Sequence, residues 1–203
     1  MKKLTPAQLL VLFFVASFSL SCGGGSATTA SNSNSSSLNT EVAGATPFAS
    51  DEGGFTVALP PGYASPRESK NEQTGWVSYL SAGPSGKACA VGYRPISDEI
   101  ASSLDSPEKK QKALEIFRDD SIKGMEAGGM AIATEKEEKI IAEGHPGLLL
   151  QGSAAGKGNA TYFRIANILA NARAYRISFF SNDKDALDKA EIQAFFKSLR
   201  IKT

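Results

Sequence analysis

Residues 161–180 read TYFRIANILANARAYRISFF, two strand-like runs separated by a single Asn-Ala pair. In the second run Tyr175, Ile177 and Phe179 occupy every other position, as in a β-strand that buries one face. Strands joined by so short a connection pair antiparallel, because a parallel pair needs a long crossover. This stretch therefore predicts an antiparallel hairpin near the C-terminal end of the chain.

Turn-forming residues divide the preceding sequence into further short strands. Proline and glycine interrupt the apolar runs at Pro60-Pro61-Gly62 and at Gly144-His145-Pro146-Gly147, and proline lacks the N–H that a strand needs. The runs 76–80 and 87–93 are spaced as a hairpin, which puts Cys89, Val91 and Tyr93 on one face. The other predicted strands cover residues 55–59, 132–141 and 148–153.

Two segments have the periodicity of amphipathic helices. Ser106-Pro107-Glu108 is typical of a helix start, so we predict a helix over residues 107–127 that ends at Gly128-Gly129. A final helix is predicted over 184–199. The expected core residues are Leu114, Phe117, Ile122 or Ser121, and Met125 in the first helix, and Ile192, Phe195, Phe196 and Leu199 in the second. Together these elements predict an α+β fold, an antiparallel β-sheet packed by amphipathic helices.

A run of mixed charge lies within one predicted strand. Glu135, Glu137 and Lys139 fall on alternate positions of the strand 132–141 and are expected on its solvent-exposed face. We expect Ile140 and Ile141 to enter the sheet. The charge run is therefore interpreted as a solvated strand face.

The N-terminus has the layout of an export signal. Lys2 and Lys3 precede an apolar run at residues 9–20, which is shorter than the roughly 20 residues of a membrane-spanning helix. Ser19-Leu20-Ser21-Cys22 resembles the bacterial lipoprotein signal, and the resemblance implies a signal peptide at 1–21 and a lipid on Cys22. The alternative is an ordinary cleaved signal peptide followed by an incidental cysteine.

The composition divides the remainder into a tether and one domain. Residues 22–47 are dominated by Gly, Ser, Thr, Ala and Asn, a composition typical of a disordered tether, and residues 48–203 have the usual size of a single globular domain. The formal net charge of the whole chain is +1. Since a near-neutral domain exerts no net attraction on phosphate backbones, we expect no nucleic acid among its partners.

Few residues are suited to catalysis or metal binding. Cys89 and His145 are the thiol and imidazole that remain beyond Cys22, but Cys89 is expected in a buried strand and His145 in a turn. The loop 152–158 lacks the spacing and the Ser or Thr of a phosphate-binding loop. The acids at Asp183, Asp185 and Asp188 do not fit a calcium loop and are expected to favour a helix N-terminus. We therefore expect no catalytic residue, no metal and no cofactor.

Two further stretches resemble the PsbP-like group of proteins. They are GFTVALPPGY at residues 54–63, where the domain begins, and FFKSLRI at 195–201, where it ends. The resemblance implies an α/β/α sandwich and a role in binding or assembly, and it brings no catalytic motif with it. These signals concern packing and turns, so they support a fold more than a function.

Three functions compete on these observations. The first is a lipid-anchored module of the cell envelope, on the outer membrane or the periplasmic face if two membranes are present, that binds an envelope protein or a small ligand without catalysis. The second is an envelope hydrolase whose site is assembled from scattered residues. The third is a carrier that holds an apolar ligand between sheet and helix. A deep apolar pocket would favour the carrier, and an exposed patch with Trp76 or Tyr63 would favour partner binding.

Overall fold

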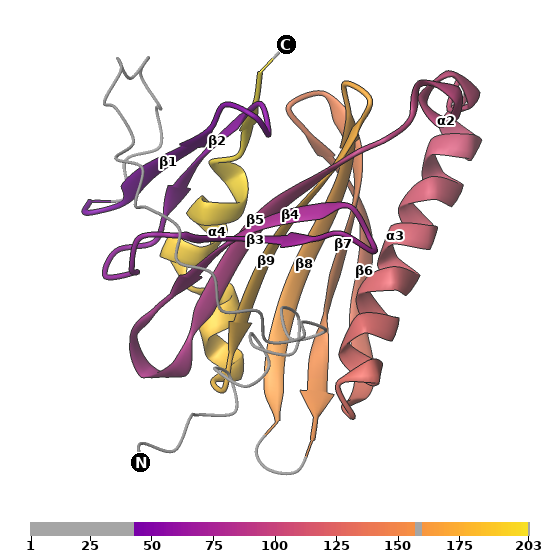
Figure 1. Ribbon diagram of the computed structural model, residues 1–203. Coiled ribbons are helices and arrows are strands. Elements are labelled where there is room, and N and C mark those ends of the chain that lie inside the picture. Colours follow the sequence, from indigo (N-terminus) through magenta and orange to yellow (C-terminus); the bar gives the residue numbers. More distant parts are fainter. Residues whose placement is uncertain (1–42, 157–159, 203) are drawn as a thin grey trace.

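The hairpin at residues 161–180 lies inside a seven-stranded antiparallel sheet. The computed structural model describes residues 43–156 and 160–202, so the export signal, Cys22, most of the tether and part of the loop 152–158 lie outside the described residues. The sheet order is β3-β4-β5-β9-β8-β7-β6 (Figure 1). The strands are β3 Arg67–Asn71, β4 Trp76–Ala82, β5 Ala88–Pro95, β6 Ala131–Ala142, β7 His145–Ala155, β8 Thr161–Ala170 and β9 Arg173–Ser181.

Two tight hairpins organise the centre and one edge of this sheet. β8 and β9 are joined by Asn171 and Ala172, and β6 and β7 by Glu143 and Gly144, and all four residues have positive φ. Two consecutive positive φ angles match the twist of the flanking strands, as in a type I′ turn. The prediction that His145 belongs to the turn is wrong, because the two-residue turn is complete at Gly144 and His145 already begins β7.

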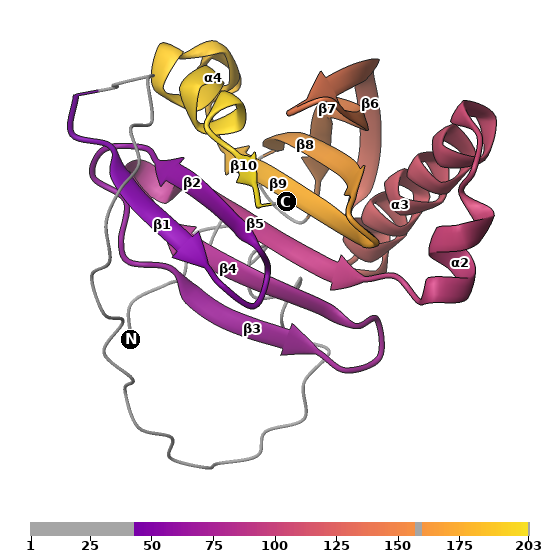
Figure 2. The same ribbon diagram turned by 90° about the horizontal axis from the view of Figure 1, so that it is seen from above.

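A second, three-stranded sheet covers part of one face of the large sheet. It contains β1 Thr46–Ser50, β2 Phe55–Leu59 and β10 Arg200–Ile201, in the order β1-β2-β10. Both pairs are antiparallel, with Ile201 opposite Phe55. β10 joins the end of the described chain to the start of the domain, as Figure 2 shows, and neither β1 nor β10 was predicted from the sequence.

The helices lie on opposite faces of the large sheet (Figures 1 and 2). α3 Pro107–Ala127 follows the short helix α2 Asp98–Ser103 and packs against β6, β7 and β8. The predicted helix 107–127 is confirmed, and the residues that it buries are Leu114, Phe117, Ser121 and Met125. α4 Ala190–Lys197 lies on the other face, beside β2 and β9. The predicted antiparallel α+β fold is confirmed, with a small sheet added to the α4 layer.

The final helix is shorter than predicted. Residues Lys184–Asp188 form a 3-10 helix, and Lys189 is extended before α4 begins. The side chain of Arg164 donates a 2.8 Å hydrogen bond from Nη1 to the Leu187 carbonyl oxygen. In a continuous α-helix this oxygen would accept from the N–H of Glu191, whereas here it accepts from Arg164 at the break between the two segments.

The charged strand β6 is solvent-exposed, as predicted, but the expectation that Glu135 and Glu137 share one face is wrong. A register shift between Thr134 and Lys136 lets Glu135 pair with Lys184 on the α4 side while Glu137 faces α3. The two isoleucines of the strand also separate. Ile140 packs against the core on the α4 side of the sheet, whereas Ile141 is 74% exposed. The expectation that both enter the sheet is wrong, because adjacent strand residues point to opposite faces. Glu137 projects toward α3 and accepts hydrogen bonds of 3.0 Å from Arg118 Nη1.

Candidate functional site

The thiol and the imidazole lie far apart. Cys89 is on β5 and His145 begins β7, with β9 and β8 between them. In the strand register, Cys89 of β5 pairs with Phe179 of β9, Phe179 pairs with Arg164 of β8, and Arg164 pairs with Gln151 of β7. Gln151 lies six positions beyond His145 along β7. Strand spacings of about 4.8 Å and rises of about 3.3 Å per residue give about 14 Å across the sheet and about 20 Å along it. This geometry does not bring the two groups together as a catalytic pair.

The environment of Cys89 suppresses its reactivity. Its side chain is 0% exposed, and burial raises its pKa to about 12, with a smaller opposing contribution from the Ser81 hydroxyl. The group is therefore a neutral thiol at neutral pH, and only the thiolate is a good nucleophile. Cys89 belongs to the hydrophobic core, together with Val91 and Tyr93 on the same strand face.

Substituting these two residues should have unequal effects on stability. Cys89→Ser is expected to lower the free energy of unfolding by about 1–3 kcal/mol, because it buries a hydroxyl beside Ser81, whose own hydroxyl already donates to the Ala64 carbonyl. His145→Ala is expected to change it by less than about 0.5 kcal/mol, since the half-buried imidazole has no hydrogen-bond partner among the described residues. Urea unfolding of both variants measures the difference. Equal losses would contradict this account of the two sites.

The acids near residue 185 have structural roles. The Asp183 carboxylate accepts a 3.1 Å hydrogen bond from the Asp185 N–H at the start of the 3-10 helix. Asp188 forms a 3.0 Å ion pair with Arg164, which is 6% exposed and also donates to Gln151. Within residues 43–156 and 160–202, no group of three or more His, Cys, Asp and Glu residues is arranged to hold a metal ion. The helices of these ranges include none with the length and hydropathy needed to cross a membrane.

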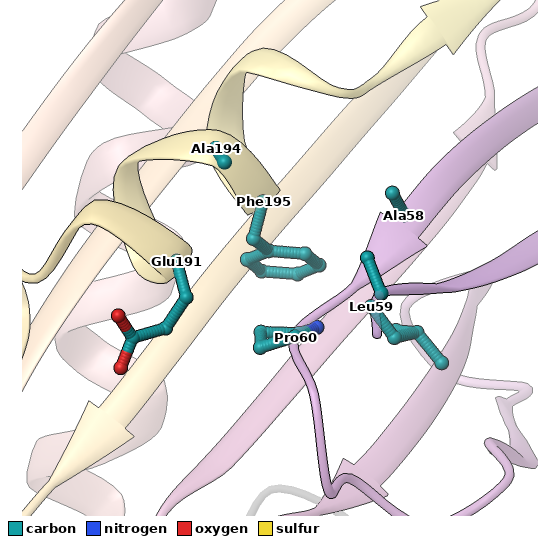
Figure 3. A pocket seen from close by; sticks show the side chains of 7 residues that line it. Ala58, Leu59, Pro60, Glu191, Ala194 and Phe195 are labelled. Carbon is teal, nitrogen blue, oxygen red and sulfur yellow. The ribbon is translucent and has the colours of Figure 1, made fainter. Parts of the chain in front are cut away.

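A hollow between α4 and β2 lies where the carrier hypothesis requires a pocket. Figure 3 shows the Phe195 ring beside Pro60, with the Glu191 carboxylate directed away from Leu59. The empty space amounts to about 200 Å³, open solvent included. Sites for small ligands occupy about 300–1,000 Å³, so this hollow is too small for an apolar ligand without movement of α4. Its lining residues are Ala45, Ala58, Leu59, Pro60, Glu191, Ala194 and Phe195.

Of the two aromatic residues singled out in the sequence, Tyr63 is partly buried and packs against the core. Its ring covers Gly83 so closely that a Cβ there would lie 2.4 Å from the ring carbons. Its hydroxyl is buried without a hydrogen-bond partner among the described residues, and desolvation raises its pKa. Trp76 lies on the opposite face of the sheet and is also buried, with 8% of its surface exposed, so it forms no exposed patch either.

Two arginines and two aromatic rings meet beside α3. The guanidinium carbon of Arg176 lies 4.3 Å from the centroid of the Trp76 ring. The guanidinium carbon of Arg94 lies 4.7 Å from the Phe117 centroid and 5.6 Å from that of Trp76. The two rings meet edge to face, with centroids 6.5 Å apart. We call these four residues the arginine–tryptophan cluster.

Strand alternation produces this cluster. Val77 of β4 pairs with Tyr93 of β5, which pairs with Tyr175 of β9, and all three side chains point into the core on the α4 side. The adjacent residues of these strands must then project toward α3. Trp76, Arg94 and Arg176 are such neighbours, and Phe117 reaches them from α3.

The hydrogen bonds of the cluster hold Arg176 more firmly than Arg94. Arg176 donates from Nε to Asn167 Oδ1 at 2.9 Å and from Nη2 to the Phe117 carbonyl oxygen at 3.2 Å. Arg94 donates from Nη1 to the Thr74 carbonyl oxygen at 3.5 Å. Arg94 is therefore the more adjustable of the two side chains.

The cluster carries positive charge that no close carboxylate neutralises. Among the described residues neither Arg94 nor Arg176 has an acidic oxygen within ion-pair distance. Burial, and to a smaller extent the charge of Arg94, lower the pKa of Arg176 to about 10, and Asp120 opposes both effects. Burial also lowers the pKa of Arg94, again opposed by Asp120. Both side chains remain cationic at neutral pH.

The two arginines of the cluster reach solvent because α3 covers only part of the sheet, whereas the rings of Trp76 and Phe117 are buried. α3 lies against β6, β7 and β8, and the α3-side residues Ser78, Leu80 and Ala90 of β4 and β5 are only half-buried. Arg94 and Arg176 are half-buried as well. Sequence reasoning missed both arginines. The available signal was a charged side chain inside each of two otherwise apolar strands.

Comparison with known proteins supports the fold. No family model matches the chain, and no curated protein matches it in sequence. The solution structure of cyanobacterial PsbP (CyanoP) from Synechocystis superposes with a TM-score of 0.55 at 11% sequence identity, covering 82% of this chain and 98% of CyanoP. The chain has a PsbP-like fold. The resemblance seen in residues 54–63 and 195–201 is thereby confirmed for the fold alone.

Two other solved structures are more distant. A crystal structure from Bacteroides thetaiotaomicron has a TM-score of 0.49 at 10% identity, with 79% of this chain and 50% of that chain covered. A protein of unknown function from Pseudomonas aeruginosa has a TM-score of 0.42 at 15% identity, with coverages of 79% and 99%. CyanoP is thus the comparison on which the description of the PsbP-like fold rests.

Proposed function

We propose that this protein is a lipid-anchored module of the cell envelope whose PsbP-like domain binds a protein or a small ligand without catalysis. The observation that carries the proposal is the arginine–tryptophan cluster. It places positive charge with no close carboxylate on two half-buried arginines that stack on the buried rings of Trp76 and Phe117, and arginine and aromatic residues are the types that dominate binding hot spots. The proposed lipid anchor is Cys22, and the proposed tether is the segment 22–47, whose composition is typical of a disordered chain.

The competing functions receive less support from the same geometry. A hydrolase that uses a thiol and an imidazole would need Cys89 and His145 close together, and they lie three strands apart in the order of the sheet. A carrier would need a larger space than the hollow between α4 and β2. Binding at the arginine–tryptophan cluster would use Arg94 and Arg176, which are half-buried.

Photo-crosslinking in the cell tests the proposal. A photoreactive amino acid at Ser78 of β4, which is half-buried beside the cluster, is expected to capture a distinct envelope protein, or a small molecule identified by mass spectrometry. The same amino acid at Ile141, which is 74% exposed at the far edge of the sheet, is the control position. A labelling pattern at Ser78 identical to that at Ile141 would contradict a binding function at this face.

A further inference from the structure

The arginine–tryptophan cluster has more hydrogen-bond donors than acceptors. Nη1 of Arg176 and both Nε and Nη2 of Arg94 donate no hydrogen bond to any residue that the structure describes. Asn167, which accepts from Arg176, is 1% exposed, and its Nδ2 has no partner in the same ranges. Guanidinium groups form their strongest hydrogen bonds with carboxylate and phosphate oxygens, often two at once.

The charges of the cluster also favour an anion. Arg94 is close enough to Arg176 to disfavour the charged form of Arg176. The rings of Trp76 and Phe117 offset part of this repulsion through cation–π contacts. Asp120 of α3 attracts both arginines from beyond ion-pair distance. A group carrying negative charge between the two guanidinium groups would remove the repulsion and supply the missing acceptors.

The neighbouring strand surface places a further hydrogen-bond donor near the arginines, beside a glycine where an added Cβ would lie 2.8 Å from the Val77 carbonyl oxygen. Arg176 lies opposite Gly92 of β5, which has no side chain, and Gly92 lies opposite Ser78 of β4. The Ser78 hydroxyl makes no hydrogen bond to a described residue and lies 3.0 Å from where a Cβ on Gly92 would be. A hydroxyl donor therefore faces the same small area as the two arginines.

From this arrangement we infer that the arginine–tryptophan cluster is an oxyanion site, which takes a carboxylate or phosphate group of the ligand. The inference rests on the proposed function, because it names the chemical class that the binding module recognises. Arg176, fixed by Asn167 and by the Phe117 carbonyl, provides the preformed part of the site. Arg94, held by one long hydrogen bond, is the part that adjusts to the anion.

Tryptophan fluorescence can report directly on the site, because Trp76 is the single tryptophan of the chain. The full-length protein in detergent is titrated at pH 8 and constant ionic strength with inorganic phosphate, with citrate and with glycerophosphoglycerol, the soluble headgroup of phosphatidylglycerol. Sodium chloride is the reference. At least one oxyanion is expected to give a saturable change in emission, which calorimetry checks independently. The anion that binds with the highest affinity indicates whether the natural ligand group is a free phosphate, a carboxylate or a lipid headgroup.

Variants on either side of the site should shift the affinity in opposite directions. Arg94→Gln is expected to weaken binding at least about tenfold, since one charge-assisted hydrogen bond contributes about that factor. Asp120→Asn is expected to strengthen binding, because it removes the carboxylate that competes for both arginines. Arg67→Gln, the same charge change at an exposed position on β3, is the matched control and should have no effect. Arg94→Lys, which keeps the charge but lacks the planar fork, should bind with intermediate affinity.

Two results would overturn the inference. One is a wild-type protein whose emission and calorimetric signal do not saturate with any of the three anions. The other is an Arg94→Gln protein that is folded by circular dichroism and binds with unchanged affinity. If crosslinking at Ser78 still identifies a partner in either case, the binding function stands and only the oxyanion assignment falls. A failure of crosslinking with intact anion binding would instead contradict the proposed function.

Discussion

Replacing Phe55 by alanine is expected to lower the free energy of unfolding by about 3–5 kcal/mol, the usual range for a large aromatic residue in a core. Phe55 is 0% exposed at the start of β2. Its ring lies among four others, with centroid distances between 6.0 and 6.5 Å. The four are Phe48, Tyr79, Tyr93 and Tyr175.

The position of Phe55 explains why a large loss is expected. The ring comes from the three-stranded sheet, and three of its aromatic neighbours come from the seven-stranded sheet, so it joins the two layers. The backbone approaches the ring closely as well, since a Cβ on Gly53 would lie 2.6 Å from it. A cavity at this point cannot be filled by small shifts, because strands on both sides are fixed by their pairing.

Urea unfolding followed by circular dichroism measures this effect. Phe55→Leu should lose less than Phe55→Ala, because leucine fills part of the space. Thr56→Ala on the same strand is the control, with an expected loss below about 1 kcal/mol, since this residue is half-buried on the opposite face. If Phe55→Ala and Thr56→Ala gave the same midpoint, the ring would not be joining the two layers.

Replacing Cys22 by alanine is expected to remove most of the protein from its membrane position. If the mature chain begins at a lipidated Cys22, its acyl chains hold the domain at the membrane, because each buried CH₂ contributes about 0.8 kcal/mol. A single acyl chain would bind only marginally, so stable anchoring needs more than one. Without the thiol, no lipid can be attached at this position. Membrane fractionation and mass spectrometry of the N-terminal peptide measure the change, and the wild-type peptide is expected to begin at Cys22 with added acyl mass.

The second cysteine provides the matched control for this experiment. Cys89→Ala removes the other thiol of the chain, and it should leave the protein in the membrane fraction because Cys89 is enclosed in the core. An unmodified wild-type N-terminus at another residue would contradict lipidation. Equal distributions of the wild type and Cys22→Ala between the fractions would contradict anchoring through Cys22.

The lipid anchor bears on the proposed oxyanion site. A lipid on Cys22, as proposed, would limit the ligands that the domain meets to those near the membrane surface, and the charge of the cluster would select anionic groups among them. Salt should weaken the selection, because the arginines are half-buried and in contact with solvent. The fold contributes by holding Arg176 rigidly at the edge of α3 while the neighbouring strands remain uncovered.

Local sequence patterns were sufficient for most elements of the fold. The alternation of Tyr175, Ile177 and Phe179 and the short Asn171-Ala172 connection determine a strand pair whatever surrounds them. Ser106 similarly accepts a hydrogen bond from the Lys109 N–H at the start of α3. These features depend on residues a few positions apart, so a single sequence contains them. The polar strand β3, with the sequence RESKN, has no such pattern and forms only because β4 provides a partner.

Tertiary structure alone decided the features that depend on distant residues. β10 is a strand because Arg200 and Ile201 pair with β2, and Arg164 of β8 donates to the Leu187 carbonyl oxygen where the helix before α4 breaks. The candidate site arises in the same way, since Trp76, Arg94 and Arg176 lie on three different strands. The sequence by itself determined the α+β class, the main strands, the long helix and the burial of Cys89. It could not determine which arginines would meet, because that depends on strand order and register, and these are set by packing between segments far apart in the chain.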